Sequence, residues 1–488
     1  MSAARPEARL SASRILGALM GPAAGECPAW VIQGAAGLIA LEVASIVITG
    51  LMGPVLGIGI VVLPLYALLC WISLPAAWLL TLASVPFSFE LLFPIASSAL
   101  WLPTEPMIIV FLAVWIVRAL LHGTHSIPRS PVLAILAVLA ILAILSGIGS
   151  RNPVLSVKAI MSTAWLAAFG FLFPLLHGGE KGFLRRALLV LALAGIGAAI
   201  YGLNFLAHHG VSRWLGNEMG HPFFPEHGTY SVFESFALAA VLALSLSARR
   251  AHWRWIGFGA AVLVTLAIVL SFARAAYLGL VASLAIVFWH LARAGKVRTV
   301  LALVVLTATV GLGIARFQAS VYLSTTVATI SEPGDPSNME RISRWLAAWN
   351  MVRDHPLLGV GYANYEDAYY SYRVLTLKTQ ERFRRMGVHS EYFRILSEMG
   401  WLGFGACLTF LVLVFRQGSI AIGRARSPTD RAMAMGALAG FVTYLVHGAF
   451  NNFGENAKIM VPFWFFVALI TILWSRTRDP GPATSRGT

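Results

Sequence analysis

The sequence predicts an all-α polytopic membrane protein with about 12–14 transmembrane helices and one large extramembrane loop that carries interfacial helices. Its mean hydropathy is +0.76, and 58% of its 488 residues are hydrophobic. Charged residues make up 12%, which is too few to cover a water-soluble protein of this size. Long apolar segments recur along the chain, and only one long stretch is polar.

An α-helix that crosses ~30 Å of hydrocarbon needs about 20 mostly apolar residues. By this criterion we predict about fourteen spans, at 30–50, 52–72, 75–96, 105–121, 131–149, 154–176, 184–207, 228–248, 254–272, 274–292, 298–317, 396–415, 430–450 and 457–475. Gly53 and several prolines interrupt the first three, so two of these are open to a re-entrant or merged arrangement.

The connections between spans predict the orientation, because Lys and Arg are retained on the cytoplasmic side. With the N-terminus inside, 21 of the 36 Lys and Arg residues fall on the inner side, and nine of the others lie in the long polar loop. We therefore expect both termini in the cytoplasm and the loop on the outer face. Anionic lipid headgroups are the natural partners of the net charge of +15, which needs no nucleic acid.

We expect five parts, namely a cytoplasmic N-terminal segment 1–29, membrane helices in 30–317, a loop subdomain 318–395, membrane helices in 396–475 and a cytoplasmic tail 476–488. The first part lacks the compact apolar core of a cleaved signal peptide, so the first helix is expected to be an uncleaved anchor.

Several familiar sites are absent from the sequence. There is no P-loop motif, no H-E-x-x-H and no Asp-x-Asp pair, and the three cysteines lie far apart without C-x-x-C spacing. We therefore expect neither a cofactor nor a metal site.

Arginines are the first candidates for chemistry. Arg274 lies between two spans with almost no loop, where a guanidinium is costly unless it snorkels or meets an anion. Arg341 and Arg344 share one face of a predicted interfacial helix, about 339–353, and their alternative role is ion pairing with neighbouring acids. Because guanidinium groups bind phosphate bidentately, converging arginines suit a lipid-linked phosphate or pyrophosphate.

Two other features belong to the same loop. Trp345 and Trp349 form an i, i+4 pair suited to lying on the membrane. His389 precedes the next membrane helix, where it can titrate near neutral pH and act as a general base, or serve as a hydrogen-bonded structural residue.

These elements occur in a recognisable order. SFARAAYLGL around Arg274 is followed by R-x-x-x-W from Arg341, D-H-P-L-L-G-V-G from Asp354, and H-S-x-Y-F…E-x-G-x-x-G from His389 to Gly403. This order resembles the bacterial O-antigen ligase and O-antigen polymerase superfamily over roughly residues 270–405, about a quarter of the chain.

The resemblance implies an inverting, metal-independent glycosyltransferase in the bacterial inner membrane. Its donor would be a glycan on undecaprenyl pyrophosphate, and its acceptor a hydroxyl on lipid A–core, a growing glycan or a protein, on the periplasmic face. Arg274 and Arg341 would hold the pyrophosphate and His389 would help to activate the acceptor. Many members have Ser-Arg-Gly around the first arginine and His-Asn at the histidine, whereas this chain has Ala273-Arg274-Ala275 and His389-Ser390.

Further polar residues are secondary candidates. Glu226 and His227, which open the eighth span, could line a substrate path, although Glu226 is equally explained as a helix-start acid. Buried acids and a polar group at the outer end of the thirteenth span could complete the site or be structural, and these are Glu42, Glu234, His447, Asn451, Asn452, Glu455 and Lys458.

Four functions stay open. Ligase, polymerase and protein O-glycan ligase use the same donor and differ only in the acceptor. A polysaccharide-lipid flippase or other transporter would also fit the helix count, but such carriers commonly repeat their halves, and no internal repeat is found.

Overall fold

The computed structural model describes residues 54–93, 98–123, 130–293, 295, 336–374 and 387–478. The predicted spans 30–50 and 298–317, the N-terminal segment 1–29, Glu42 and most of the C-terminal tail lie outside these residues. The chain divides into two compact units, and each is described by itself. The first comprises residues 1–81 and 105–124, and the second 82–104 and 125–488.

In the first unit, α3 (Pro54–Ile72) is followed directly by α4 (Leu74–Ser84), and α5 (Thr104–His122) returns beside them. Arg118 of α5 donates to the carbonyls of Cys70 at 3.2 Å and Trp71 at 2.8 Å. These belong to the last turn of α3, whose carbonyls have no partner within the helix, so Arg118 caps it.

The predicted span 75–96 is wrong in its second half. α4 ends at Ser84, a 3-10 turn η1 (Val85–Phe87) follows, and β1 (Phe89–Phe93) pairs antiparallel with β2 (Ser98–Leu102). Pro86 cannot donate to a helical hydrogen bond, and the buried ammonium of Lys458 binds the carbonyl oxygens of Val85 at 3.0 Å and Ser88 at 2.7 Å. An apolar hairpin has the same hydropathy as a helix, so composition did not distinguish them.

The other predicted spans of the second unit that lie in the described residues each correspond to a helix, although α18 (Glu391–Arg424) runs well beyond the predicted 396–415. In chain order they are α6 (Pro131–Ile148), α7 (Pro153–Ala167), which continues through the π-helical turn η2 (Ala168–Leu172) into α8 (Phe173–His177), α9 (Phe183–His209), α11 (His227–Ser247), α12 (Ala251–Leu270), α13 (Arg274–Arg293), α18 (Glu391–Arg424), α19 (Pro428–Gly448) and α20 (Ala457–Arg478). Among the described residues nine helices are long and apolar enough to cross a membrane, so the all-α polytopic class is confirmed.

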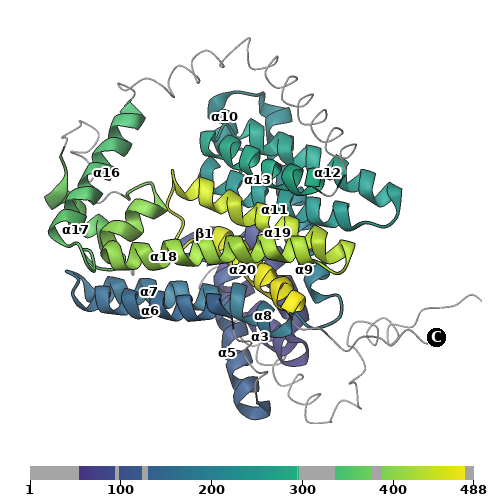
Figure 1. Ribbon diagram of the computed structural model, residues 1–488, viewed down its shortest axis with the longest axis horizontal. Helices are drawn as coiled ribbons and strands as arrows, with labels where there is room; N and C mark the ends of the chain where they lie inside the picture. Colours follow the sequence, from purple (N-terminus) through teal and green to yellow (C-terminus); the bar gives the residue numbers. More distant parts are fainter. Residues whose placement is uncertain are drawn as a thin grey trace, which may run out of the picture. The chain divides into compact units, whose positions relative to one another are not determined.

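Small residues let the central helices approach closely. α11 packs against α9, α12 and α19 (Figure 1). α20 is buried from Ala457 to Trp474. A Cβ on Gly195 would lie 2.1 Å from the Cβ of Ala237, and one on Gly436 would lie 2.5 Å from the Cβ of Ala243. Such contacts are typical of membrane helices, whose association depends on close backbone packing.

The polar loop folds onto the start of α18. α16 (Pro336–Asp354) contains the predicted helix 339–353, and α17 (Tyr365–Tyr372) packs beside it. The predicted tryptophan pair does not form one surface. Trp345 is partly buried and stacks on Phe393 at 5.5 Å, whereas Trp349 is 45% exposed and contacts Trp401.

Candidate active site

Arg274 is positioned by a tight turn between α12 and α13. The hydroxyl of Ser271 donates to the carbonyl of Ile268 at 2.6 Å, and Phe272 adopts a left-handed φ of 55°. The next helix starts two residues later, with Arg274 as its first residue. The turn therefore fixes the backbone of this arginine where α13 begins.

His227 links the start of α11 to the short helix before it. It opens α11, and its Nδ1 bonds to Oδ1 of Asn217 in the short helix α10 (Arg213–Glu218). The guanidinium charges of Arg213, Arg274 and Arg341 all act on this imidazole. These arginines come from α10, from the α12–α13 turn and from α16, which are far apart in sequence.

Arg344 ties α16 to the segment that carries His389. Its side chain is buried, and its guanidinium donates to Oε2 of Glu340 at 3.2 Å and to the carbonyl of Gly387 at 3.2 Å. Its Nε has no partner among the described residues. The hydroxyl of Tyr365 donates to the Arg344 carbonyl at 2.8 Å, so α17 joins the same assembly.

His389 follows Gly387, whose carbonyl Arg344 binds, by two residues and has a left-handed backbone conformation with φ 53°. Burial and the positive charges of Arg344 and Arg341 lower the pKa of His389 to about 4, against an opposing effect of Glu340. The expected near-neutral pKa is therefore wrong, and the imidazole is uncharged at pH 7. A neutral imidazole can accept a proton, which a general base requires.

The residue after the histidine has a structural role. The Oγ of Ser390 accepts a hydrogen bond from the amide of Phe393, as the N-cap of α18. The asparagine found in many family members can cap a helix equally well. The His-Ser sequence of this chain therefore keeps the helix start behind His389.

The predicted site residues do not all share one environment. Arg344 binds the carbonyl two residues before His389 and Arg341 lies on the same helix, whereas Arg274 and His227 are the first residues of α13 and α11. Glu226 is exposed and precedes α11 without a capping bond from its side chain, so its role in binding stays a prediction. The sequence analysis did not single out Arg213 and Asn217, because the segment between α9 and α11 carries no recognisable motif.

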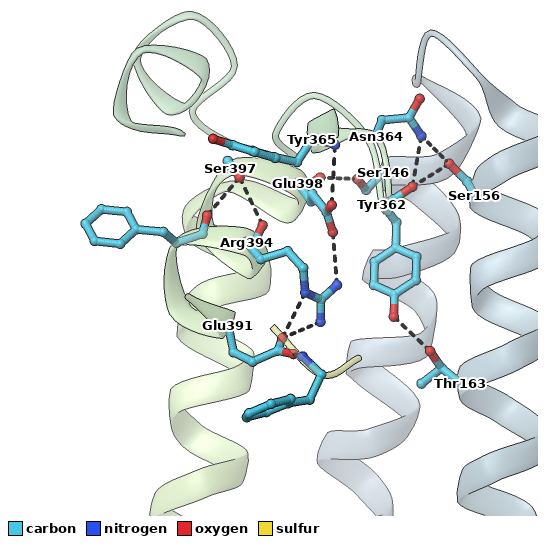
Figure 2. Close-up of polar contacts among 12 residues, drawn as sticks. Ser146, Ser156, Thr163, Tyr362, Asn364, Tyr365, Glu391, Arg394, Ser397 and Glu398 are labelled. Atoms are coloured by element: carbon cyan, nitrogen blue, oxygen red, sulfur yellow. Dashed lines mark hydrogen bonds and ion pairs between the residues drawn. The ribbon is translucent and has the colours of Figure 1, made fainter. Parts of the chain in front are cut away.

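Beside the candidate site lies a buried ion-pair network on α18 (Figure 2). The guanidinium of Arg394 donates from Nε and Nη2 to Oε2 of Glu391, at 2.8 and 2.6 Å, and from Nη1 to Oε2 of Glu398 at 3.1 Å. Both carboxylates are almost fully buried. Two acids thus surround one arginine within the first two turns of the helix.

The two glutamates hold three other segments, two through their carboxylates and one through a backbone carbonyl. The second oxygen of Glu391 accepts from the amide of Phe453, in the loop between α19 and α20. Oε1 of Glu398 accepts from the amide of Tyr365 at 3.4 Å, and its carbonyl accepts from the hydroxyl of Ser146 at 2.6 Å. The network therefore ties α18 to α6, to the start of α17 and to the loop between α19 and α20.

Two glycines allow the loop after α16 to lie on α18. Gly359 and Gly400 both have left-handed φ angles, 68° and 64°. A Cβ on either would lie 2.4 Å from backbone atoms of the opposite segment. The amide of Val360 donates to the Ser397 carbonyl at 2.9 Å, and that of Trp401 to the Pro356 carbonyl at 2.8 Å. The glycines of the D-H-P-L-L-G-V-G and E-x-G motifs thus permit a backbone-to-backbone contact.

The secondary candidates separate into two kinds. Lys458 is committed to the carbonyls that end η1, so it is not open to a substrate. Glu234 and His447 are fully buried in α11 and α19, and their polar side-chain atoms have no partner among the described residues.

Residues 259–408 match the family model described as O-antigen ligase. This range runs from α12 into α18 and includes Arg274, Arg341, Arg344 and His389. The resemblance found in the sequence is confirmed for this part of the chain. No curated protein matches the chain.

Replacing Arg394 by Met should destabilise the protein by about 3–5 kcal/mol, because it leaves two buried carboxylates without their cation. Thermal unfolding of the purified protein in detergent would measure the change. Arg416→Met, on the exposed side of the same helix, is the matched control. Equal unfolding temperatures for both variants would contradict this account of the network.

Proposed function

Because residues 259–408 match the O-antigen ligase family, we propose that this protein is a membrane glycosyltransferase. In this proposal it moves a glycan from undecaprenyl pyrophosphate to an acceptor hydroxyl, at the periplasmic face of the bacterial inner membrane, with both termini in the cytoplasm. The observation that carries the proposal is the position of the buried Arg344, which shares a helix with Arg341 and binds the carbonyl of Gly387, two residues before His389.

The arginines suit the leaving group. In the transfer, the bond between the anomeric carbon and the pyrophosphate oxygen breaks, and the departing pyrophosphate takes the electron pair. Guanidinium groups stabilise the charge that develops on its oxygens through charge-assisted, bidentate hydrogen bonds. Arg274 and Arg341 would make these contacts. Arg344, which binds Glu340 and the Gly387 carbonyl, would hold the helix of Arg341 close to His389.

His389 suits the acceptor side. The acceptor oxygen attacks the anomeric carbon from the face opposite the leaving group, which inverts the configuration, and its proton passes to the imidazole. The lowered pKa of His389 keeps the base uncharged before reaction. The negative charge of a bound pyrophosphate would raise this pKa and so favour proton acceptance once the donor is in place.

The acceptor distinguishes ligase, polymerase and protein O-glycan ligase, and we favour the ligase because the matched family is described as O-antigen ligase. A deletion strain of the host, with and without a plasmid-borne copy, tests this. Long glycans left on the lipid carrier with bare lipid A–core would indicate a ligase. Single repeat units in place of long chains would indicate a polymerase, and loss of glycan from protein alone the third activity. No change in any glycan pool would contradict the glycosyltransferase.

His389→Ala and Arg341→Ala should each abolish transfer while the protein still reaches the membrane. Loss of a general base or of a leaving-group cation typically costs about 10²–10⁴-fold in rate. Complementation of the deletion strain, with membrane protein amounts measured in parallel, tests both. Arg353→Ala, an exposed arginine on the same helix as Arg341, is the control and should complement fully. Normal glycan from either site variant would remove that residue from the proposed mechanism.

The pH dependence should follow the protonation of His389. Because its pKa is lowered to about 4, the neutral base is present above that pH, and kcat/KM should fall only as the pH drops through about 4. The acid limb of kcat should lie at higher pH, since the bound pyrophosphate raises the pKa. Steady-state rates with purified protein, over the pH range in which it stays folded, would measure both limbs. A limb of kcat/KM near the ordinary histidine pKa of about 6.5 would contradict the environment described for His389.

A further inference from the structure

The short helix α10 lies in the connection between α9 and α11, and neither the motifs nor the matched family range includes it. Its first residue, Arg213, has an exposed side chain. The helix is locally well defined. Ser212 caps it, because its hydroxyl oxygen accepts from the amide of Leu215 at 3.1 Å and its carbonyl accepts from the amide of Gly216 at 2.8 Å.

α10 rests directly on the turn that positions Arg274. A Cβ on Gly216 would lie 2.4 Å from the carbonyl oxygen of Leu270 and 2.4 Å from the Phe272 ring. Only a glycine permits this approach, and Phe272 is the residue whose left-handed backbone makes the turn possible. The contact brings the backbones of α10 and the α12–α13 turn together.

A second contact fixes the other side of α10. Asn217, next to the packed glycine, bonds to His227 at the start of α11. This same imidazole is acted on by Arg213, Arg274 and Arg341 together. α10 is therefore held from two directions, and it places Arg213 beside the turn that leads into Arg274.

Guanidinium groups near one another repel, and an anion bound between them is attracted to each of them. A pyrophosphate has two phosphate groups and can accept hydrogen bonds from more than two guanidinium groups. We propose that Arg213 is a third arginine that binds the pyrophosphate of the donor, together with Arg274 and Arg341. This inference rests on the proposed function and adds a binding residue to the same site.

Binding of farnesyl diphosphate and farnesyl monophosphate to the full-length protein, in detergent micelles free of phospholipid, tests the proposal. Arg213→Ala should weaken diphosphate binding about 10- to 100-fold, the loss typical of one charged hydrogen-bonding group, and should reduce the preference for diphosphate over monophosphate. Arg213→Lys keeps the charge without the bidentate fork and should fall between wild type and Arg213→Ala. Arg341→Ala should also lose the preference, whereas Arg353→Ala should keep it.

Wild-type diphosphate affinity in Arg213→Ala, with Arg341→Ala impaired, would overturn the inference and leave the proposed function standing. That result is also expected if Arg213 serves only phospholipid headgroups, since none are present in the micelles. A wild-type protein with no preference for diphosphate would overturn both. Unfolding temperatures of all variants identify a folding defect, and Arg213→Lys with the wild-type fold and full wild-type preference would count against a bidentate contact by Arg213.

Discussion

The arrangement of the loop on α18 depends on one buried cation. Arg394 stands between Glu391 and Glu398 on the turns of α18 that precede the non-helical Gly400, where buried unpaired charges are costly. Each acid uses its other oxygen on a backbone amide from another segment, Phe453 or Tyr365. The charges are thus compensated only when α18, the loop after α16 and the α19–α20 loop lie in their observed places.

This compensation explains how a polar loop can present a defined site above apolar helices. The loop does not rest on hydrophobic contact alone. It is joined to α18 by the carboxylate of Glu398, by backbone bonds across Gly359 and Gly400, and by the Arg344 bond to the Gly387 carbonyl. His389 lies between these anchors, two residues before Glu391. A base held by such fixed neighbours needs little reorganisation when a substrate arrives, which favours electrostatic catalysis.

The candidate site is assembled from four short pieces rather than one motif. The α12–α13 turn supplies Arg274, α16 supplies Arg341, the segment before α18 supplies His389, and α10 lies against the first of these through Gly216. Gly216 packs α10 against the α12–α13 turn, and the Ser212 cap defines the start of α10. The backbone of this piece is therefore fixed by contacts that do not depend on the charges of the arginines.

The sequence by itself determined the fold class and most of the described membrane helices, because hydropathy and helical length are local properties of a chain. Arg274, Arg341 and His389 stay predictions of the sequence as site residues. The sequence did not determine that residues 89–93 and 98–102 form an antiparallel strand pair, since an apolar strand and an apolar helix have the same composition. It also did not show that Trp345 is partly buried against the ring of Phe393. Only the tertiary structure decided the low pKa of His389 and the position of Arg213, because burial and the approach of charges from distant helices depend on how the whole chain packs.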